Sequence, residues 1–313
     1  MRLLIVTYFY APANSPRAFR WQSIAEYWAN QGHGIDILCC PTPGLPSHEI
    51  LNGVNVYRTS PGLVESVRLK LGGGTGEAPA PGDAVSVAPS NGLANNLRRA
   101  ARILHDATWK KLYWPDSACL WRRPASALGA QLISDNSYDA LISVSDPFTS
   151  HLVGMGLHRQ SRSTPWIVDI GDPFCCREDT PINNYALYRT RNRRAEGRVF
   201  EGASAISVTT EPTLSQYADI FPESAGKIAV IPPLLSLPKT SAASEPFFAD
   251  SPAIRLLFVG TLYRDIRSPR FLLEIFDRVS RTITGLPIEL HFVGKVLGCD
   301  DILAPFQSQI GDS

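Results

Sequence analysis

Two segments of this chain repeat one pattern, in which an apolar run leads through a loop ending in Ser-Pro-Arg into a helical stretch. They occupy residues 3–21 and 254–273. Ser15 and Ser268 stand where a helix N-cap belongs, and each is followed by a proline at the first helical position, where no N–H is needed. Each segment therefore predicts the start of an α/β domain. Together they predict two facing domains with a cleft between them.

Between these openings, short β-rich runs alternate with helical patterns, which is the order that builds a parallel sheet covered by helices on both faces. The fold class is therefore predicted as α/β: a Rossmann-like doubly wound parallel sheet followed by the beginning of a second Rossmann-like domain. Predicted strands cover residues 3–7, 35–39, 54–58, 140–145, 166–170, 205–208, 228–231 and 255–259, and predicted helices cover residues 17–31, about 95–113, 121–135, 148–160, 185–201 and 212–220.

Composition along the chain predicts where the domains begin and end. The first domain covers residues 1–235 and is interrupted at 60–93 by a Gly- and Pro-rich stretch that cannot supply a packed core. That insertion is either a lid near an acceptor site or an ordinary surface loop. A polar linker follows over 236–253. The remainder, 254–313, is too short for a complete doubly wound sheet, so we expect an incomplete second domain.

Charge and cysteine usage exclude several classes of protein. The net charge of +1 argues against a nucleic-acid binder. The six cysteines form no C-x-x-C, which favours a reduced, cytoplasmic protein without a structural zinc site. No apolar run has the length of a bilayer span. The basic and aromatic segment 97–116 suggests peripheral contact with the inner face of a membrane or, alternatively, a solvated face of a surface helix.

Two Asp-Pro-Phe motifs come directly after predicted strands, at Asp146 and at Asp172. Ligands of parallel sheets collect at the carboxyl ends of strands, so both carboxylates are candidates for the site. Asp146 could instead cap the helix that follows it, and Asp172 could instead stabilise a turn. Arg17 and Arg20 lie in the first turn of the first helix, where positive charge opposes the helix dipole. An anionic partner would explain them, as would solvent exposure or pairing with carboxylates.

A second candidate site follows the strand 255–259. Gly260 comes directly after this strand, and Arg264, Arg267 and Arg270 crowd the loop and the first helical turn. A helix N-terminus with nearby arginines is suited to a phosphate or a diphosphate. Arg270 is equally well explained as a solvated helix residue, which leaves Arg264 and Arg267 as the candidates.

Several catalytic motifs are missing from the sequence. There is no G-x-G-x-x-G after the first strand and no phosphate-binding G-x-x-x-x-G-K-[ST], so dinucleotide oxidoreductases and nucleoside triphosphatases lose their usual support. Neither a G-x-S-x-G nor an H-E-x-x-H occurs, which disfavours hydrolases. No Asp-x-Asp is present, so nothing calls for a divalent metal.

Taken together, these segments resemble the retaining GT-B glycosyltransferases of the group 1, family 4-like type. The resemblance is carried by LLIVTYFYAPANSPRAFRWQSIAEYWANQGHGIDILC, GVNVYR, DALISVSDPF, PWIVDIGDPF, KIAVIPP and RLLFVGTLYRD, and it spans most of residues 1–297. It implies an N-terminal acceptor domain, a C-terminal domain that holds a nucleotide-diphosphate sugar, and metal-independent transfer with retention. The sequence thus predicts Asp172 as the catalytic residue, acceptor contacts from Arg17, Arg20 and Asp146, and donor contacts from Gly260, Arg264 and Arg267.

The chain departs from that family in its second domain. Thr261 stands where the family commonly has Arg, and the Glu-seven-Glu motif that holds the donor sugar and ribose has no counterpart, since only Glu274 and Glu289 follow the linker. We therefore expect a fragment, a frameshifted product or a protein that no longer catalyses. The leading prediction is sugar transfer to a glycan or lipid-linked acceptor, inactive in this truncated form. The alternative is a non-catalytic remnant that binds an acceptor or a partner protein.

Overall fold

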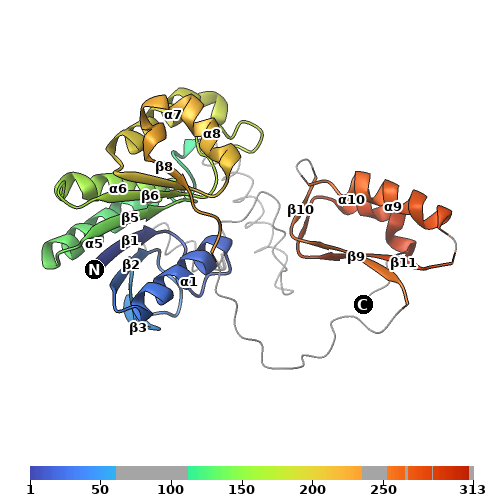
Figure 1. Cartoon of the computed structure of the whole chain (residues 1–313), viewed down its shortest axis with the longest axis horizontal. Coiled ribbons are helices and arrows are strands. Elements are labelled where there is room, and N and C mark those ends of the chain that lie inside the picture. The colour runs from blue at the N-terminus through green and yellow to red at the C-terminus, as the bar shows by residue number, and fades with distance from the viewer. Residues whose placement is uncertain (61–111, 235–251, 265–266, 284, 310–313) are drawn as a thin grey trace, which may run out of the picture. The chain divides into compact units, whose positions relative to one another are not determined.

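The computed structural model describes residues 1–60, 112–234, 252–264, 267–283 and 285–309. These residues form two compact units, one of residues 1–60 and 112–234 and one of the described residues from 252 to 309 (Figure 1). Nearly all of the predicted insertion at 60–93, most of the linker at 236–253 and most of the basic segment at 97–116 lie outside the described residues.

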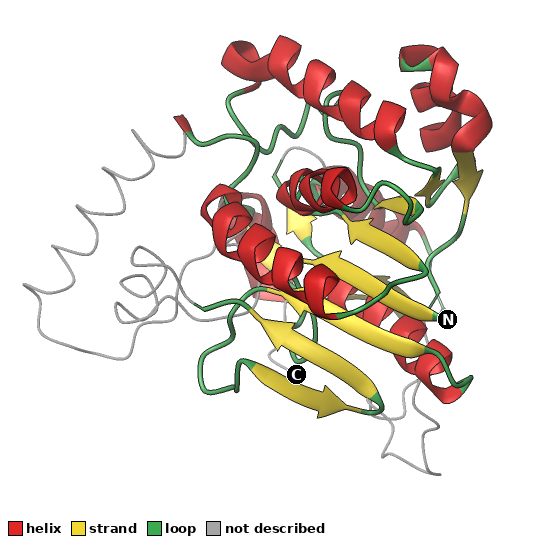
Figure 2. Ribbon diagram, turned by 90° about the vertical axis from the view of Figure 1, so that its left-hand side faces the viewer, coloured by secondary structure: helices red, strands yellow, loops and turns green. Residues whose placement is uncertain are grey.

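Unit 1 is built on one eight-stranded sheet with the order β3-β4-β2-β1-β5-β6-β7-β8. Every neighbouring pair is parallel except β3 with β4, so the predicted parallel sheet is confirmed and the antiparallel edge strand β3 is an addition to it. Figure 2 shows these strands side by side. The strands are β1 (Arg2–Thr7), β2 (Gly34–Cys39), β3 (His48–Leu51), β4 (Val54–Arg58), β5 (Ala140–Val144), β6 (Trp166–Ile170), β7 (Ala205–Val208) and β8 (Ile228–Val230).

Helices cover both faces of this sheet, because side chains alternate along each strand. Leu3 and Ile5 of β1 pack with Trp21 and other residues of α1, whereas Leu4 and Val6 join the larger core beneath the other helices. Figure 1 shows α1 on the side of the sheet opposite α7 and α8. The helices of unit 1 are α1 (Pro16–Asn30), α5 (Arg122–Asp135), α6 (Thr149–Gln160), α7 (Tyr185–Gly202) and α8 (Glu211–Ile220).

Unit 2 begins with the predicted strand and helix. Strand β9 (Ile254–Val259) is parallel to β11 (Ile288–Val293), and helix α9 (Arg270–Thr282) lies between them in sequence. A second parallel pair joins β10 (Leu262–Tyr263) to β12 (Val296–Leu297), and the short helix α10 (Asp300–Leu303) follows. Much of the apolar surface of this unit is exposed, including Leu257, Val259 and Phe271.

The helix starts agree with the sequence in one unit and not in the other. Ser15 is the N-cap residue of α1 and Pro16 its first residue, although the Ser15 side chain makes no capping hydrogen bond. Helix α9 begins at Arg270 with Pro269 as its N-cap residue, so the prediction of Ser268 as the cap is wrong by one position.

Candidate functional site

The candidate site of unit 1 lies at the carboxyl ends of β1, β5 and β6. Strand β1 has β2 on one side and β5 on the other, so the strand order reverses direction at this point of the sheet. In open α/β sheets, ligands bind at such a switch point, outside the carboxyl ends of the strands. The loops after β5 and β6 carry Asp146 and Asp172, and the first turns of α1, which follows β1, carry Arg17 and Arg20.

The two Asp-Pro-Phe motifs meet at this edge. The rings of Phe148 and Phe174 stack nearly parallel, with centroids 3.8 Å apart, and both side chains are buried. Stacking of aromatic rings adds to the free energy of burial. The contact fixes the loops after β5 and β6 against each other and brings Asp146 and Asp172 to one rim.

Arg17 and Asp172 form an ion pair across this rim. The guanidinium Nη2 of Arg17 lies 3.3 Å from Oδ2 of Asp172, whose side chain is 61% exposed. A Cβ atom at Gly171 would overlap the Arg17 guanidinium, so this glycine makes room for the arginine. On the same rim, Arg177 Nη1 lies 3.7 Å from Oδ2 of Asp146. Burial raises the pKa of Asp146, and the charge of Arg177 opposes that shift.

Arg20 takes a different position from the one predicted. Its side chain is buried, and Nη1 lies 3.1 Å from Oδ2 of Asp169 in β6. Trp21 Nε1 donates to the same oxygen at 2.9 Å, and Ser207 Oγ donates to the other oxygen at 2.6 Å. Arg20 therefore ties α1 to β6 and β7 from inside the unit. This is a positioning role in the fold, and an acceptor contact by Arg20 stays a prediction.

Four of the buried polar side-chain atoms that have no hydrogen-bond partner among the described residues lie in or around the first turn of α6. They are Ser145 Oγ, Ser150 Oγ, His151 Nε2 and Arg17 Nε, and the others are Tyr10 Oη, Arg20 Nε and Arg58 Nε. Unpaired buried polar groups are rare in native proteins and often mark places where a ligand or water binds. The set therefore points to a polar ligand at this edge of the sheet.

His151 was not predicted from the sequence, and neither were Ser145 and Ser150. The Nδ1 atom of His151 lies 2.8 Å from Ser143 Oγ, which also accepts a hydrogen bond from Trp166 Nε1 at 2.9 Å. The Ser143 hydroxyl is then best satisfied by donating to Nδ1, which leaves a proton on Nε2. Burial lowers the pKa of His151 to about 3, and Arg17 acts in the same direction. His151 is thus a neutral imidazole with a free N–H donor.

The N-terminus of α6 is capped from a distance. Asp116 Oδ2 accepts from the backbone N–H of Thr149 at 2.8 Å, and Asp116 Oδ1 accepts from the Thr149 hydroxyl at 2.7 Å. Helix α6 begins at Thr149, with no capping hydrogen bond from the side chain of its N-cap residue, Phe148. The interpretation of Asp146 as the cap of this helix is therefore wrong, and its carboxylate is free to lie at the rim.

Asp116 leads to a pH prediction. Burial raises its pKa to about 7. The folded state then binds this proton more tightly than the unfolded state, so the stabilisation is complete below about pH 4 and is lost as the pH rises towards 7. We expect the free energy of unfolding to fall by about 1 to 4 kcal/mol over this range because of Asp116. Urea denaturation at pH 5 and pH 8 measures it.

Asp116→Asn provides the control, because the amide cannot titrate. Burial raises the pKa values of Glu196 and Asp146 as well, so the parent and the variant share those contributions. The free energy of unfolding changes with pH in both proteins, and the difference between the two changes gives the contribution of Asp116, whatever the absolute stability of the variant. An identical pH dependence would show that Asp116 keeps its charge throughout.

The candidate donor site of unit 2 centres on two glycines. Gly260 and Gly294 follow the parallel strands β9 and β11 with φ of 146° and 140°. A Cβ atom on Gly294 would overlap the backbone carbonyl of Gly260. Arg264 forms a two-pronged ion pair with Asp301, at 2.6 and 2.9 Å, which lowers the pKa of that carboxyl. The side chain of Arg267 is exposed. The predicted convergence of arginines thus exists only in part.

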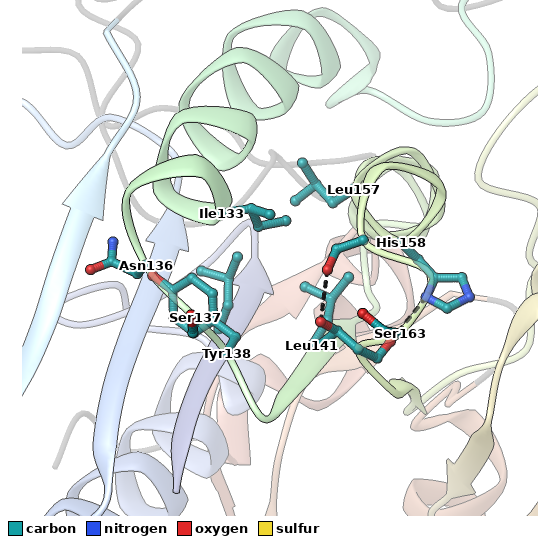
Figure 3. A pocket seen from close by; sticks show the side chains of 11 residues that line it. Ile133, Asn136, Ser137, Tyr138, Leu141, Leu157, His158 and Ser163 are labelled. Atoms are coloured by element: carbon teal, nitrogen blue, oxygen red, sulfur yellow. Dashed lines mark hydrogen bonds between the residues drawn. The ribbon is translucent and has the colours of Figure 1, made fainter.

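Two other features of the described residues carry no candidate function. A cavity of about 250 Å³ lies at the opposite ends of the strands, near the start of β5 (Figure 3), where His158 Nδ1 lies 3.1 Å from the carbonyl oxygen of Thr164 and Ser161 Oγ lies 2.8 Å from Thr164 Oγ1. The polar groups of His158, Ser161 and Thr164 in its lining are therefore already paired. In the described part of the chain, no group of three or more His, Cys, Asp or Glu residues could hold a metal ion.

The segment considered for membrane contact is described only at its end. There, Arg191 lies over the ring of Trp114 at 3.8 Å, and Trp114 Nε1 donates to Asn192 at 3.0 Å, so this tryptophan packs on α7. None of the helices that the structure describes has the length and the apolar character needed to cross a membrane.

Comparison with known proteins identifies the family. Residues 18–233 match the model of the glycosyl transferase 4-like domain. No curated protein sequence matches the chain. Among solved structures, one reported as trehalose-6-phosphate from E. coli bound with UDP-2-fluoro glucose matches with a TM-score of 0.52 and 12% identity, over 99% of this chain and 69% of that chain. At that identity the likeness shows the fold, which is of the GT-B type. Because the family model covers more than half of its residues, the chain belongs to the glycosyl transferase 4-like family.

Proposed function

We propose that this chain is a hexosyl- or other glycosyltransferase that moves a sugar from a nucleotide-diphosphate sugar to a glycan or lipid-linked acceptor. We further propose that transfer is metal-independent and retains the anomeric configuration. Family membership supports sugar transfer in general, and the UDP-2-fluoro glucose named for the structural match supports the class of donor. The observation that carries the proposal is the polar edge at the switch point of unit 1.

The acceptor side follows from the chemistry of that edge. A sugar offers many hydroxyl groups, which both donate and accept hydrogen bonds. The carboxylates of Asp146 and Asp172 are acceptors, while Arg17 and the His151 Nε2–H are donors without a second partner in the described structure. In this proposal, Asp172 is the catalytic residue that orients the attacking hydroxyl, and Arg17 holds Asp172 in place.

The donor side rests on unit 2. The absence of side chains at Gly260 and Gly294 lets a diphosphate approach the backbone at the strand ends. The side chain of Arg267 is exposed and can reach such an anion, whereas Arg264 would first have to leave Asp301. We therefore assign Arg267 as the stronger donor contact and Arg264 as the weaker one.

Calorimetric titration with UDP, GDP and ADP tests the donor side. Charge-assisted contacts to phosphate are worth about 1.5 to 3 kcal/mol, so Arg267→Ala should weaken binding of the preferred nucleotide about ten- to a hundredfold. Arg281→Ala is the matched control, because Arg281 pairs with Asp277 on the exposed part of α9. Equal affinity of Arg267→Ala and the parent would place the diphosphate elsewhere.

The catalytic assignment has its own test. In a form of the protein that is active in sugar transfer, Asp172→Asn should lower the rate by about a hundredfold, the usual scale for loss of a positioned carboxylate. The melting temperature should barely change, because exposed ion pairs contribute about 0 to 1 kcal/mol. Asp277→Asn removes another exposed ion pair and should change neither quantity. Unchanged transfer by Asp172→Asn would remove this residue from the site.

The alternative function is non-catalytic binding of an acceptor or a partner protein by unit 1. It uses the same polar edge of unit 1 as the first function and differs from it in needing no nucleotide donor. The two functions separate in the titration with UDP, GDP and ADP. Binding of none of them, with unit 1 folded, would support the non-catalytic role.

A further inference from the structure

The chain has two pairs of adjacent cysteines, and the fold treats them differently. Cys39 ends strand β2 and packs into the core on the α1 side, whereas Cys40 packs against the core on the other face of the sheet. Successive side chains of a strand point to opposite faces, so these two thiols diverge. Cys175 and Cys176 instead occupy a turn after β6, and both lie at the same core. Only this second pair can act together.

Contacts around Cys175 hold this pair in place. Its side chain lies in the core, and the side chain of Cys176 packs against the same core. Glu196 is buried in α7, where its Oε2 accepts from the backbone N–H of Cys175 at 2.8 Å and its Oε1 accepts from the Tyr217 hydroxyl at 2.6 Å. The Glu196 carboxyl therefore anchors the cysteine turn.

The two thiols differ in exposure and in acidity. Cys175 is buried, and Cys176 is half-buried and so open to small solutes. The neighbouring Cys175 lowers the pKa of the Cys176 thiol, and Arg177 acts in the same direction against burial and Glu196. The neighbouring Cys176, burial and Glu196 all raise the pKa of Cys175. Since the thiolate is the reactive form, Cys176 is the nucleophile of the pair.

We propose that Cys175 and Cys176 form a peroxide-reactive modification site, in which Cys176 is oxidised first and Cys175 closes a disulfide between the two neighbours. The Cys176 thiolate attacks one oxygen of hydrogen peroxide, the O–O bond breaks, and hydroxide leaves, which yields a sulfenic acid. The Cys175 sulfur then attacks the Cys176 sulfur. The S–O bond breaks, and the hydroxyl leaves as water with the Cys175 proton. In total, two thiols lose two electrons and one peroxide becomes two water molecules.

This site adjoins the proposed sugar site. The cysteine turn lies between Asp172 and Arg177, the residues that pair with Arg17 and with Asp146. A disulfide between neighbouring residues constrains the backbone of its turn. Oxidation is therefore expected to shift the Arg177 side chain away from Asp146.

Mass spectrometry of the full chain tests the proposal. Cleavage after Arg and Lys releases both cysteines in peptide 163–177 and the other pair in peptide 21–58. After treatment of the reduced protein with hydrogen peroxide, peptide 163–177 should lose two hydrogen atoms and regain them with dithiothreitol. Peptide 21–58 should react at least about tenfold more slowly, because its buried thiol is not a thiolate. Faster oxidation of peptide 21–58, or no loss of hydrogen from 163–177, overturns the proposal.

Variants then assign the roles. Cys175→Ser should stop at a sulfenic acid on Cys176 that dimedone traps, Cys176→Ser should lose the reaction, and Cys40→Ser should behave as the parent. Trapping on Cys175 in Cys176→Ser would reverse the assignment and overturn it. Phenylarsine oxide provides a measurement that needs no variant, because one arsenic bridges two thiols with release of water. The parent should bind it in peptide 163–177 and then resist peroxide, and failure to bind there contradicts a converging pair.

Discussion

Replacing Asp169 with alanine should destabilise unit 1 by about 3 to 5 kcal/mol, which is the usual cost of breaking a buried ion pair from one side. The carboxylate is buried and receives hydrogen bonds from Arg20, Trp21 and Ser207. Its loss leaves the Arg20 guanidinium buried, with the Ile231 carbonyl oxygen, 3.4 Å from Nη2, as its remaining acceptor among the described residues. For a domain of this size we expect the melting temperature to fall by roughly 6 to 20 °C in differential scanning calorimetry.

Asp172→Ala is the matched control for this prediction. Asp172 lies three residues after Asp169 and also pairs with an arginine of α1, Arg17, but the side chain of Asp172 is 61% exposed. We expect its loss to cost less than about 1 kcal/mol. The double variant Arg20→Met, Asp169→Leu should recover part of the stability, because no charge is then left buried. Equal effects of Asp169→Ala and Asp172→Ala would contradict the buried network.

Gly294→Ala should have the largest effect within unit 2. The new Cβ atom would overlap the Gly260 carbonyl, and the backbone would stay at a φ of 140°, where only glycine is relaxed. Strain of this kind costs about 1 to 3 kcal/mol, and the overlap adds to it by forcing β9 and β11 apart. We expect loss of protection of the β9 and β11 amides in hydrogen exchange.

Gly298→Ala separates the overlap from the backbone strain. Gly298 has a φ of 66°, and a Cβ atom there meets nothing within 4 Å. It should therefore cost only about 1 kcal/mol and leave the protection of β9 and β11 unchanged. If the β9 and β11 amides exchange their hydrogens equally fast in Gly294→Ala and Gly298→Ala, the close approach of Gly260 and Gly294 does not stabilise the unit.

The fold could be predicted from the sequence because its signals are local. Alternating apolar runs and helical patterns located the strands of the large sheet except β3, the short edge strand formed by His48–Leu51. That strand has only four residues, and its alternate positions, His48 and Ile50, are exposed. A second signal, which the prediction did not use, is the repeat of Phe-Val-Gly at 258–260 and 292–294. In the structure, Phe258 pairs with Phe292 in register. Comparing the two would have found Gly294.

The site could be predicted only as far as its location. The residues after parallel strands were recognised, but their partners come from distant segments. Asp169 sits within a predicted strand, and nothing in the sequence shows that Arg20, 149 positions away, is paired with it. In the sequence, His151 is simply one residue of a predicted helix. Its free Nε2–H becomes evident only from the structure, in which Ser143 occupies Nδ1 and Trp166 donates to the Ser143 hydroxyl.

The cap of α6 has a consequence for how substitutions spread through this edge. The carboxylate that terminates the helix comes from Asp116, 33 positions away, and the acidic residue three positions before the helix is thereby released from that duty. A substitution at position 116 that removes the side-chain oxygens would leave the Thr149 N–H without its acceptor. Asp146 is the carboxylate nearest in sequence that could then accept this hydrogen bond. A mutation of Asp116 would thus draw the Asp146 carboxylate from the rim to the start of α6, although no residue of the rim is replaced.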